Sequence, residues 1–221
     1  MGSCRKLKSS GEFDLNSYLS EMRCEKSKLA VPKKRLFFSQ GKPAKHLFFI
    51  RSGHVKLFVL SKQRKEAVIG LLGPGDVFGE WCVSGHIRQL ANAVAVTDCV
   101  VTRIHKNDVL SAMQKNEVFA NFLIGHLLRR NRTVEENLVD LMFNSTEKRL
   151  ARALLQVARF GKTEGPLLTV PKINQDTLAA LIGSTRQQVN MLMNRFKKLG
   201  FITYNEGMEV RNSLLNVLLR D

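Results

Sequence analysis

The sequence predicts an α+β protein in which an N-terminal β-barrel or jelly roll is followed by one long helix and a small C-terminal helical domain. Three observations lead to this fold class. Residues 36–104 alternate apolar and polar side chains between glycine turns, which is typical of short strands. From residue 109 to residue 142, apolar side chains recur mostly every three or four residues, as on one face of a helix. Between residues 174 and 200, two shorter helical patterns each end at a glycine.

Length and composition favour a globular protein of one or two domains. The chain has 221 residues, of which 44% are hydrophobic and 24% are charged, which is ordinary for a folded protein. Its apolar runs are far shorter than the roughly 20 residues that span a bilayer. The basic first residues are not followed by the apolar stretch of a secretory signal. We therefore expect a cytoplasmic protein with reduced thiols and no membrane partner.

The net charge favours a polyanionic partner. Lys and Arg number 35 against 19 Asp and Glu, which gives a formal net charge of +16. Such a surplus attracts nucleic acid, because each neutralised phosphate releases condensed counterions. Both halves of the chain are basic, so the charge alone does not locate a binding surface. A protein that is merely basic and soluble is the alternative at this stage.

The β-region is predicted to begin at Leu36 and to end at Ile104. Turns are expected at residues 51–53 and at residues 73–76, where glycine follows or precedes polar side chains. Many short strands at this spacing are typical of a barrel or jelly roll. The expected strands are residues 47–50, 54–59 and 67–72, with one or two more in residues 93–104.

One long helix is predicted from about Glu117 to Phe143. At ~1.5 Å per residue it is about 40 Å long, which is more than a small β domain covers. Its uncovered apolar stripe predicts a partner helix, most simply from a second copy of the chain. Arg129, Arg130 and Arg132 interrupt the stripe, so we expect this stretch to meet water at least in part.

The last third of the chain predicts a helix-turn-helix. Asn174 is a suitable N-cap, and Gly183 stands where a left-handed residue ends the first helix. The second helix is expected to begin with residues 184–187 as a capping box and to end before Gly200. A second helix of this kind can lie in the major groove of DNA. Residues 201–210 then predict a short hairpin.

Polar side chains early in the second helix are the predicted base readers. Arg binds guanine, and Gln or Asn binds adenine, through paired hydrogen bonds, while nearby basic side chains serve phosphates. For Gln187 and Gln188, a capping or a merely solvated position explains the residue as well as a base contact does. The candidate residues for DNA binding are Thr185, Arg186, Gln187, Gln188, Asn190, Lys172 and Arg195.

Catalytic and metal sites are not predicted. The glycines of residues 73–79 have the wrong spacing for a dinucleotide loop, and the common catalytic motifs are missing, so we expect no enzyme. The cysteines lack a Cys-x-x-Cys spacing, which gives no support to a zinc site or a disulfide framework. A thiol- or metal-based redox sensor that uses Cys82 and His86 is an alternative, as is an interaction module without DNA binding. The cysteines are Cys4, Cys24, Cys82 and Cys99.

Nearly the whole chain resembles the Crp/Fnr family of bacterial transcription regulators. Residues 73–80, Gly-Pro-Gly-Asp-Val-Phe-Gly-Glu, resemble the signature of its cyclic-nucleotide-binding-type β-roll, and the long helix resembles its dimerisation helix. Residues 185–190 and 195–202 resemble its winged helix-turn-helix. The resemblance implies a homodimer that binds a palindromic promoter site and contacts RNA polymerase, with Arg186 as principal base reader. An Arg often found five residues later is Met191 here, so we expect a different operator.

The resemblance also implies the complete architecture. It is an α+β fold with an N-terminal double-stranded β-helix or jelly roll, a dimerisation helix and a C-terminal winged helix-turn-helix. The expected segments are an N-terminal stretch 1–24, the β-roll 25–115, the dimerisation helix 116–143 and the DNA-binding domain 144–221.

Cyclic AMP in its usual pose is not expected as the effector. In the family's cyclic-AMP binders, an Arg-Ser pair before the alanine that matches Ala91 clamps the phosphate, and here that pair is Gln89-Leu90. Losing the cation matters because a buried anion needs a paired charge or several donors. Arg88 stands one residue early, which on a strand turns a side chain to the other face.

A local bulge would turn Arg88 back toward a phosphate, so a cyclic-nucleotide-responsive regulator is the alternative. The resemblance otherwise requires no cofactor and leaves the effector unknown. The candidate effector-pocket residues are Phe78, Gly79, Glu80, Arg88, Gln89 and Glu135.

Overall fold

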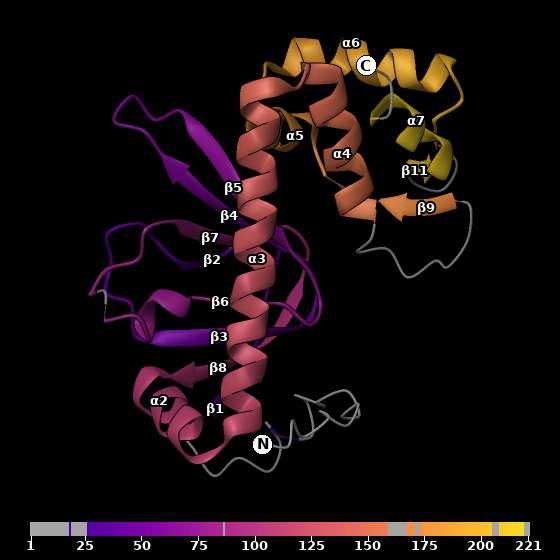
Figure 1. Cartoon of the computed structure of the whole chain (residues 1–221). Helices are drawn as coiled ribbons and strands as arrows, with labels where there is room; N and C mark the ends of the chain where they lie inside the picture. Colours follow the sequence, from indigo (N-terminus) through magenta and orange to yellow (C-terminus); the bar gives the residue numbers. More distant parts are fainter. Residues whose placement is uncertain are drawn as a thin grey trace, which may run out of the picture.

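The structure, a computed structural model, has three parts: a β-roll, a long helix beside it, and a C-terminal domain at one end of that helix (Figure 1). This arrangement confirms the predicted α+β fold with a jelly roll, a long helix and a winged helix-turn-helix. No helix in the described part of the chain is long and apolar enough to cross a membrane. The described residues are 18, 26–85, 87–158, 167–170, 173–204 and 208–218.

Two antiparallel four-stranded sheets form the β-roll, one in the order β1-β8-β3-β6 and the other in the order β2-β7-β4-β5. Their facing sides bury a core that includes Ile50, Val55 and Val101, none of which is exposed. A 3₁₀ turn, η1 (Glu80–Cys82), follows β6. The strands are β1 (Lys26–Val31), β2 (Leu36–Phe38), β3 (His46–Ser52), β4 (Val55–Leu60), β5 (Glu66–Leu72), β6 (Val77–Phe78), β7 (Asn92–Ala95) and β8 (Cys99–His105).

The turn between β3 and β4 requires glycine. Gly53 has a φ of 87°, a left-handed conformation that side chains disfavour. A Cβ there would also collide with the backbone oxygen of Asp98 and with Cys99. The predicted turn at residues 51–53 is therefore enforced by backbone geometry and by the close approach of the chain before β8.

The long helix α3 (Glu117–Phe143) has the bounds predicted from the sequence, and the shorter α2 (Lys106–Lys115) precedes it. The side chain of Asn116 caps α3, because its Oδ1 accepts a hydrogen bond from the N–H of Phe119 at 2.9 Å. Phe119 and Leu123 are buried and share one apolar cluster with residues of the β-roll. This cluster holds the first half of α3 against the β-roll.

The C-terminal domain has its own apolar core, in which Leu154, Leu178 and Phe196 are almost fully buried. Its three-stranded sheet has the order β10-β11-β9 and forms the wing. Leu71 of β5 packs against this core, so the domain rests on the β-roll as well as on α3. Its elements are α4 (Thr146–Ala158), β9 (Leu167–Val170), α5 (Gln175–Ile182), α6 (Arg186–Lys198), β10 (Ile202–Tyr204), β11 (Met208–Arg211), η2 (Asn212–Leu214) and α7 (Leu215–Leu218).

Candidate nucleic-acid interface and ligand cavity

A tight turn joins α5 to α6. The Oδ1 of Asn174 accepts a hydrogen bond from the N–H of Thr177 at 2.8 Å, which starts α5 as predicted. Gly183 ends the helix with a φ of 63°, and a Cβ on it would lie 3.0 Å from Leu141 of α3. The left-handed conformation and the close approach both favour glycine here. The turn therefore sets the start of α6 directly after α5.

The cap of α6 lies one residue later than predicted. Thr185, not Ser184, is the N-cap, and its hydroxyl oxygen accepts a hydrogen bond from the N–H of Gln188 at 3.2 Å. Ser184 instead donates a hydrogen bond from its hydroxyl to Oε1 of Gln188 at 2.7 Å. The expected capping box over residues 184–187 is therefore wrong, because Ser and Thr are both good caps and the backbone geometry selected the second. Gln187 has no capping role in this arrangement.

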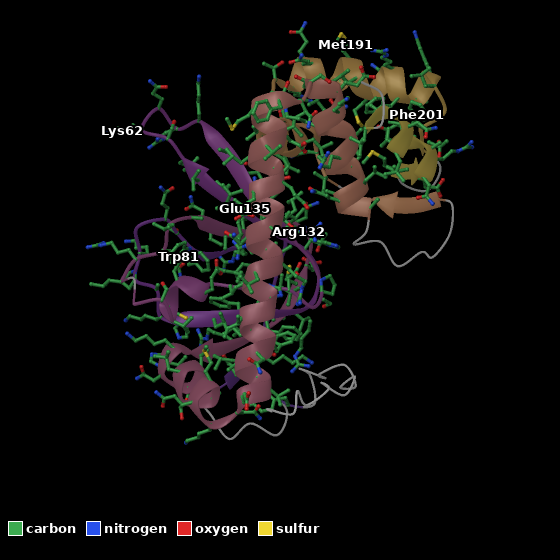
Figure 2. The ribbon with its side chains drawn as sticks, in the orientation of Figure 1. Lys62, Trp81, Arg132, Glu135, Met191 and Phe201 are labelled. Carbon is green, nitrogen blue, oxygen red and sulfur yellow. The ribbon has the colours of Figure 1, made fainter. Side chains whose placement is uncertain are left out.

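One face of α6 is buried and the other is open. Val189, Met193 and Phe196 pack into the core of the C-terminal domain. At 100° per residue, the positions opposite this face are Gln187, Met191 and Asn194. All three are exposed, and Figure 2 shows Met191 on the outer surface of α6, away from the rest of the molecule. The predicted base-reading set lacked Met191 and Asn194, although the helical period counted from the buried residues identifies both.

The candidate base readers are exposed, and their contacts are with other surface side chains. A guanidinium nitrogen of Arg186, whose side chain is 70% exposed, lies 3.4 Å from the Asp176 carboxylate. Nη1 of Arg195 lies 3.0 Å from the carboxylate of Glu147. Exposed ion pairs of this kind contribute about 0–1 kcal/mol, so a phosphate or a base edge can replace them. The described candidates in the exposed class are Thr185, Arg186, Gln187, Gln188, Asn190 and Arg195; Lys172 lies outside the described residues.

Among the candidate effector residues, Phe78 fills the interior of the β-roll. Its side chain has no exposed surface, and its ring stacks on that of Phe48 with centroids 4.9 Å apart. The rings of Phe37 and Phe38 lie against it at 5.0 Å and 6.0 Å between centroids. Aromatic packing of this density leaves little free volume beside Phe78.

Gly79 and Glu80 connect the β-roll to α3. Gly79 has a φ of 83°, and a Cβ on it would lie 2.6 Å from the backbone oxygen of His46, so only glycine fits. The next residue, Glu80, accepts a hydrogen bond from Nη1 of Arg130 at 2.8 Å. Both side chains of this ion pair are mostly buried, which strengthens it relative to a surface pair. The pair ties the turn after β6 to the middle of α3.

Arg88, Gln89 and Glu135 point in different directions. Arg88 is exposed, and its Nη1 donates a hydrogen bond to the backbone oxygen of Gly41 at 2.8 Å. The next side chain, Gln89, is only 3% exposed, and its Oε1 has no hydrogen-bond partner in the described structure. Glu135 is exposed on α3 and accepts a hydrogen bond from Nδ2 of Asn131 at 2.6 Å. The chain thus places Gln89 inside the β-roll and leaves Arg88 on the surface.

A cavity of about 530 Å³ lies between the β-roll, α3 and the C-terminal domain, within the size range of small-molecule sites. None of the candidate effector residues lines it. One lining residue is His126, whose Nε2 accepts a hydrogen bond from the N–H of Val77 at 3.2 Å. Burial lowers the pKa of His126 and outweighs the nearby Asp76 carboxylate, which acts in the opposite direction, so the ring is neutral at pH 7.

The thiols with a described environment are structural. Burial is the main cause that raises the pKa of Cys82, to about 12, and burial also raises the pKa of Cys99. A protonated, buried thiol is a poor nucleophile and a poor metal ligand. Within the described ranges no three His, Cys, Asp or Glu side chains gather as a metal site. His86, Cys4 and Cys24 lie outside those ranges.

Two family models match the chain. Residues 28–116 match the cyclic nucleotide-binding domain, and residues 148–213 match the Crp-like helix-turn-helix domain. A cyclic AMP receptor protein from Thermus thermophilus is 32% identical over 185 residues, which cover 83% of each chain. A CRP-like cAMP-activated global transcriptional regulator from Mycobacterium tuberculosis is 31% identical over 181 residues, which cover 81% of this chain and 80% of that protein.

Solved structures share the fold. FixK2 from Bradyrhizobium japonicum superimposes with a TM-score of 0.78 at 17% identity, covering 89% of this chain and 97% of that one. A CRP/FNR-family transcriptional regulator from Thermus thermophilus superimposes with a TM-score of 0.72 at 20% identity, covering 88% of this chain and 99% of that one. At these identities the likeness concerns the fold alone.

Proposed function

The chain belongs to the Crp/Fnr family of DNA-binding transcription regulators, and we propose that it acts as a homodimer that reads an inverted-repeat promoter site through α6. The exposed polar start of α6 is the observation that carries this proposal. Thr185 caps the helix, Arg186 and Gln187 follow at its free end, and the opposite face is buried in the domain core. A helix held in this way presents its N-terminal side chains to base edges in a major groove.

Arg186 is the proposed principal base reader, and the Arg186→Ala variant tests it. We expect the variant to lose about 1–3 kcal/mol of specific binding, because a paired contact from Arg to guanine is removed. Its affinity for unrelated duplex DNA is expected to change much less. Operator sequences recovered from a random duplex pool with the wild-type protein supply the target, and fluorescence anisotropy at one fixed salt concentration measures both affinities.

A matched control for that measurement is Lys62→Ala. Lys62 is exposed on the β-roll, far from α6 in Figure 2, and carries the same charge as Arg186. The two variants therefore change the net charge of the protein equally. If Arg186→Ala bound the selected operator as tightly as Lys62→Ala does, the base-reading role of Arg186 would be wrong.

The dimer is proposed from the uncovered face of α3. Ile124, Leu128, Leu138 and Met142 lie on one face of α3 and are 48%, 64%, 56% and 66% exposed. We name these four residues the α3 seam. Together with the polar Asn131 and Glu135 between the two apolar pairs, they follow the alternating four- and three-residue spacing of a two-stranded coiled coil. Exposed apolar side chains gathered on one helix face in this way are typical of an interface between protein surfaces. A second copy of the same helix, related by a two-fold axis, covers the seam with identical residues.

An inverted-repeat operator follows from that symmetry. A two-fold dimer presents two copies of α6, and each copy can enter one of two successive major grooves on the same side of the duplex. We propose that such a dimer acts at promoters with RNA polymerase as partner, in the cytoplasm of a bacterial cell. The two relatives named above are described as cAMP-responsive proteins, but we propose that this chain does not use cyclic AMP in the pose of the family's cyclic-AMP binders.

Cyclic AMP is accordingly expected not to bind tightly. Gln89 occupies the inward position at which the cyclic-AMP binders have a cation, Arg88 is on the surface, and aromatic rings pack around Phe78. A phosphate there would lack a paired charge. Calorimetric titration of the full chain is expected to show no binding at micromolar cyclic AMP. The cyclic AMP receptor protein from Thermus thermophilus, titrated in the same buffer, is the positive control, and a micromolar or tighter constant for this chain would contradict the proposal.

A further inference from the structure

The interdomain cavity has one apolar wall and one polar wall. The mainly apolar wall comes from β5, the turn after it, α4 and α5, with Ile69, Leu71, Pro74, Val157 and Leu181, and it also carries the polar Asp76 and Gln156. The polar wall is α3. It contributes His126, Arg129, Arg130, Thr133, Glu136 and Asn137, together with one apolar side chain, Val134. Such a cavity suits a ligand with an apolar body and a single polar end.

The charges that face the cavity determine which polar end fits. The Arg130 guanidinium is paired with Glu80 at 2.8 Å, and the Glu136 carboxylate is paired with Arg132 at 2.9 Å. These four charges cancel in pairs. Arg129 differs, because no carboxylate of the described residues pairs with it. Its guanidinium is the uncompensated cation of the α3 wall.

Asp76 and His126 are the remaining titratable groups of the lining. The Oδ2 of Asp76 accepts a hydrogen bond from the N–H of Gly73 at 2.8 Å, so this carboxylate stabilises its own turn. His126 is neutral, and its Nε2 already accepts the hydrogen bond from Val77. Asp76, on the turn after β5, also has no salt-bridge partner among the described residues, so a cationic group would have to reach that turn. An anionic group placed at the α3 wall gains a charge-assisted hydrogen bond from Arg129.

We propose that this cavity binds a small organic anion with an apolar body, its anionic group on Arg129 and its body against the wall formed by β5, α4 and α5. The site is distinct from the β-roll interior around Phe78, Gly79 and Gln89, none of which lines the cavity. Because its walls come from the β-roll, α3 and the DNA-binding domain, the occupant contacts both domains at once. Ligand binding to the cavity is measured without DNA. Its absence is therefore distinguishable from a failure of the proposed DNA recognition.

Decanoate is the probe that tests the proposal. It combines a carboxylate with an apolar chain, and two other compounds separate these features: acetate has the charge without the chain, and decyltrimethylammonium has the chain with the opposite charge. Calorimetric titration of the full-length protein below the micellar concentrations is expected to show binding of decanoate alone. Equal binding of decyltrimethylammonium would overturn the proposal, because an apolar cavity without charge selectivity would explain it. Absence of decanoate binding would overturn it as well.

Three variants locate the probe. Arg129→Gln removes the uncompensated cation and is expected to weaken decanoate binding about tenfold. Thr133→Phe places a ring at the cavity wall and is expected to weaken binding at least as much; Thr133 is exposed, so the fold tolerates the change. Lys62→Gln is the matched control, since Lys62 is exposed on the β-roll and neither lines the cavity nor pairs with a residue that does, and this variant is expected to bind decanoate within about twofold of wild type.

The same variants test whether decanoate binds the α3 seam instead of the cavity. Thr133 does not belong to the α3 seam, which consists of Ile124, Leu128, Leu138 and Met142. Decanoate that bound the seam would therefore bind Arg129→Gln and Thr133→Phe as it binds wild type, and that result would contradict the cavity as the site. Thermal unfolding without ligand checks that each variant is folded before its titration is interpreted.

Discussion

Leu138→Asp is expected to convert the protein to a monomer and to abolish detectable operator binding. Leu138 is 56% exposed. It is the first α3 seam residue after Glu135. In a two-fold dimer the residue meets its own copy, so the substitution introduces two carboxylates into a surface that loses water on association. Two unpaired like charges in such a place cost several kcal/mol, which is a factor of more than about 100 in the dimer constant.

Loss of the dimer removes operator binding for a separate reason. In the proposed dimer each α6 contacts one half-site, and the second contact is favourable only because the first has already brought it close to the DNA. A monomer is therefore expected to retain only weak, salt-sensitive binding to duplex DNA. Sedimentation velocity measures the oligomeric state, and anisotropy with the selected operator measures the binding.

Leu90→Asp is the control for this experiment. Leu90 is 50% exposed, about as much as Leu138, but it lies on the β-roll away from the α3 seam. It changes the net charge by the same amount and is expected to remain dimeric and to bind the operator. A dimeric Leu138→Asp protein would show that another surface carries the association.

Some features of α3 are predictable from the sequence and others are not. Its length, both ends and its uncovered stripe follow from apolar side chains at three- and four-residue spacing, and the structure confirms the helix bounds. The polar pair Asn131 and Glu135 in the middle of the seam was not recognised as a local unit. It becomes visible only in the structure, where the side chains share a hydrogen bond of 2.6 Å.

Short or polar strands were not predicted. β1 (Lys26–Val31) begins Lys-Ser-Lys, which obscures the period-2 pattern, and it exists because it pairs with β8 along its whole length. β6 (Val77–Phe78) has two residues and is defined by its pairing with β3. In both cases a partner distant in the sequence stabilises the strand, and local propensity carries little of that information.

The two candidate sites also differ in how far the sequence alone predicts them. The proposed base-reading residues lie at the start of one helix, so helical period and caps predict their exposure, with an error of one residue at the cap. The cavity is built from β5, α3, α4 and α5, which are widely separated in the sequence. Its unpaired Arg129 is identical in type to the paired Arg130 beside it, and only the position of Glu80 distinguishes the two. A local sequence pattern therefore does not predict which of the two arginines is paired.

Asp140→Ala is expected to destabilise the junction between α3 and α4 by about 3 kcal/mol. The Asp140 side chain is 7% exposed, and its Oδ2 lies 2.8 Å from Nε of Arg152. The N–H of that Nε does not point along this line, so the contact is an ion pair without a well-formed hydrogen bond. Oδ1 accepts a hydrogen bond from Nδ2 of Asn144 at 2.6 Å. The substitution removes the acceptor of Asn144 and the charge partner of Arg152, whose own side chain is 35% exposed.

The exposed pair on the same helix supplies the comparison. Glu136→Ala removes the partner of Arg132 one turn earlier, where the two side chains are 40% and 80% exposed, and is expected to cost less than about 0.5 kcal/mol. Urea unfolding followed by circular dichroism measures both variants. If Asp140→Ala cost no more than Glu136→Ala, the buried contacts of Asp140 would contribute nothing to the junction. A large cost would instead show that this carboxylate fixes the C-terminal domain to the end of α3. Operator affinity is then expected to fall together with stability, because in the proposed dimer the spacing of the two α6 helices depends on that junction.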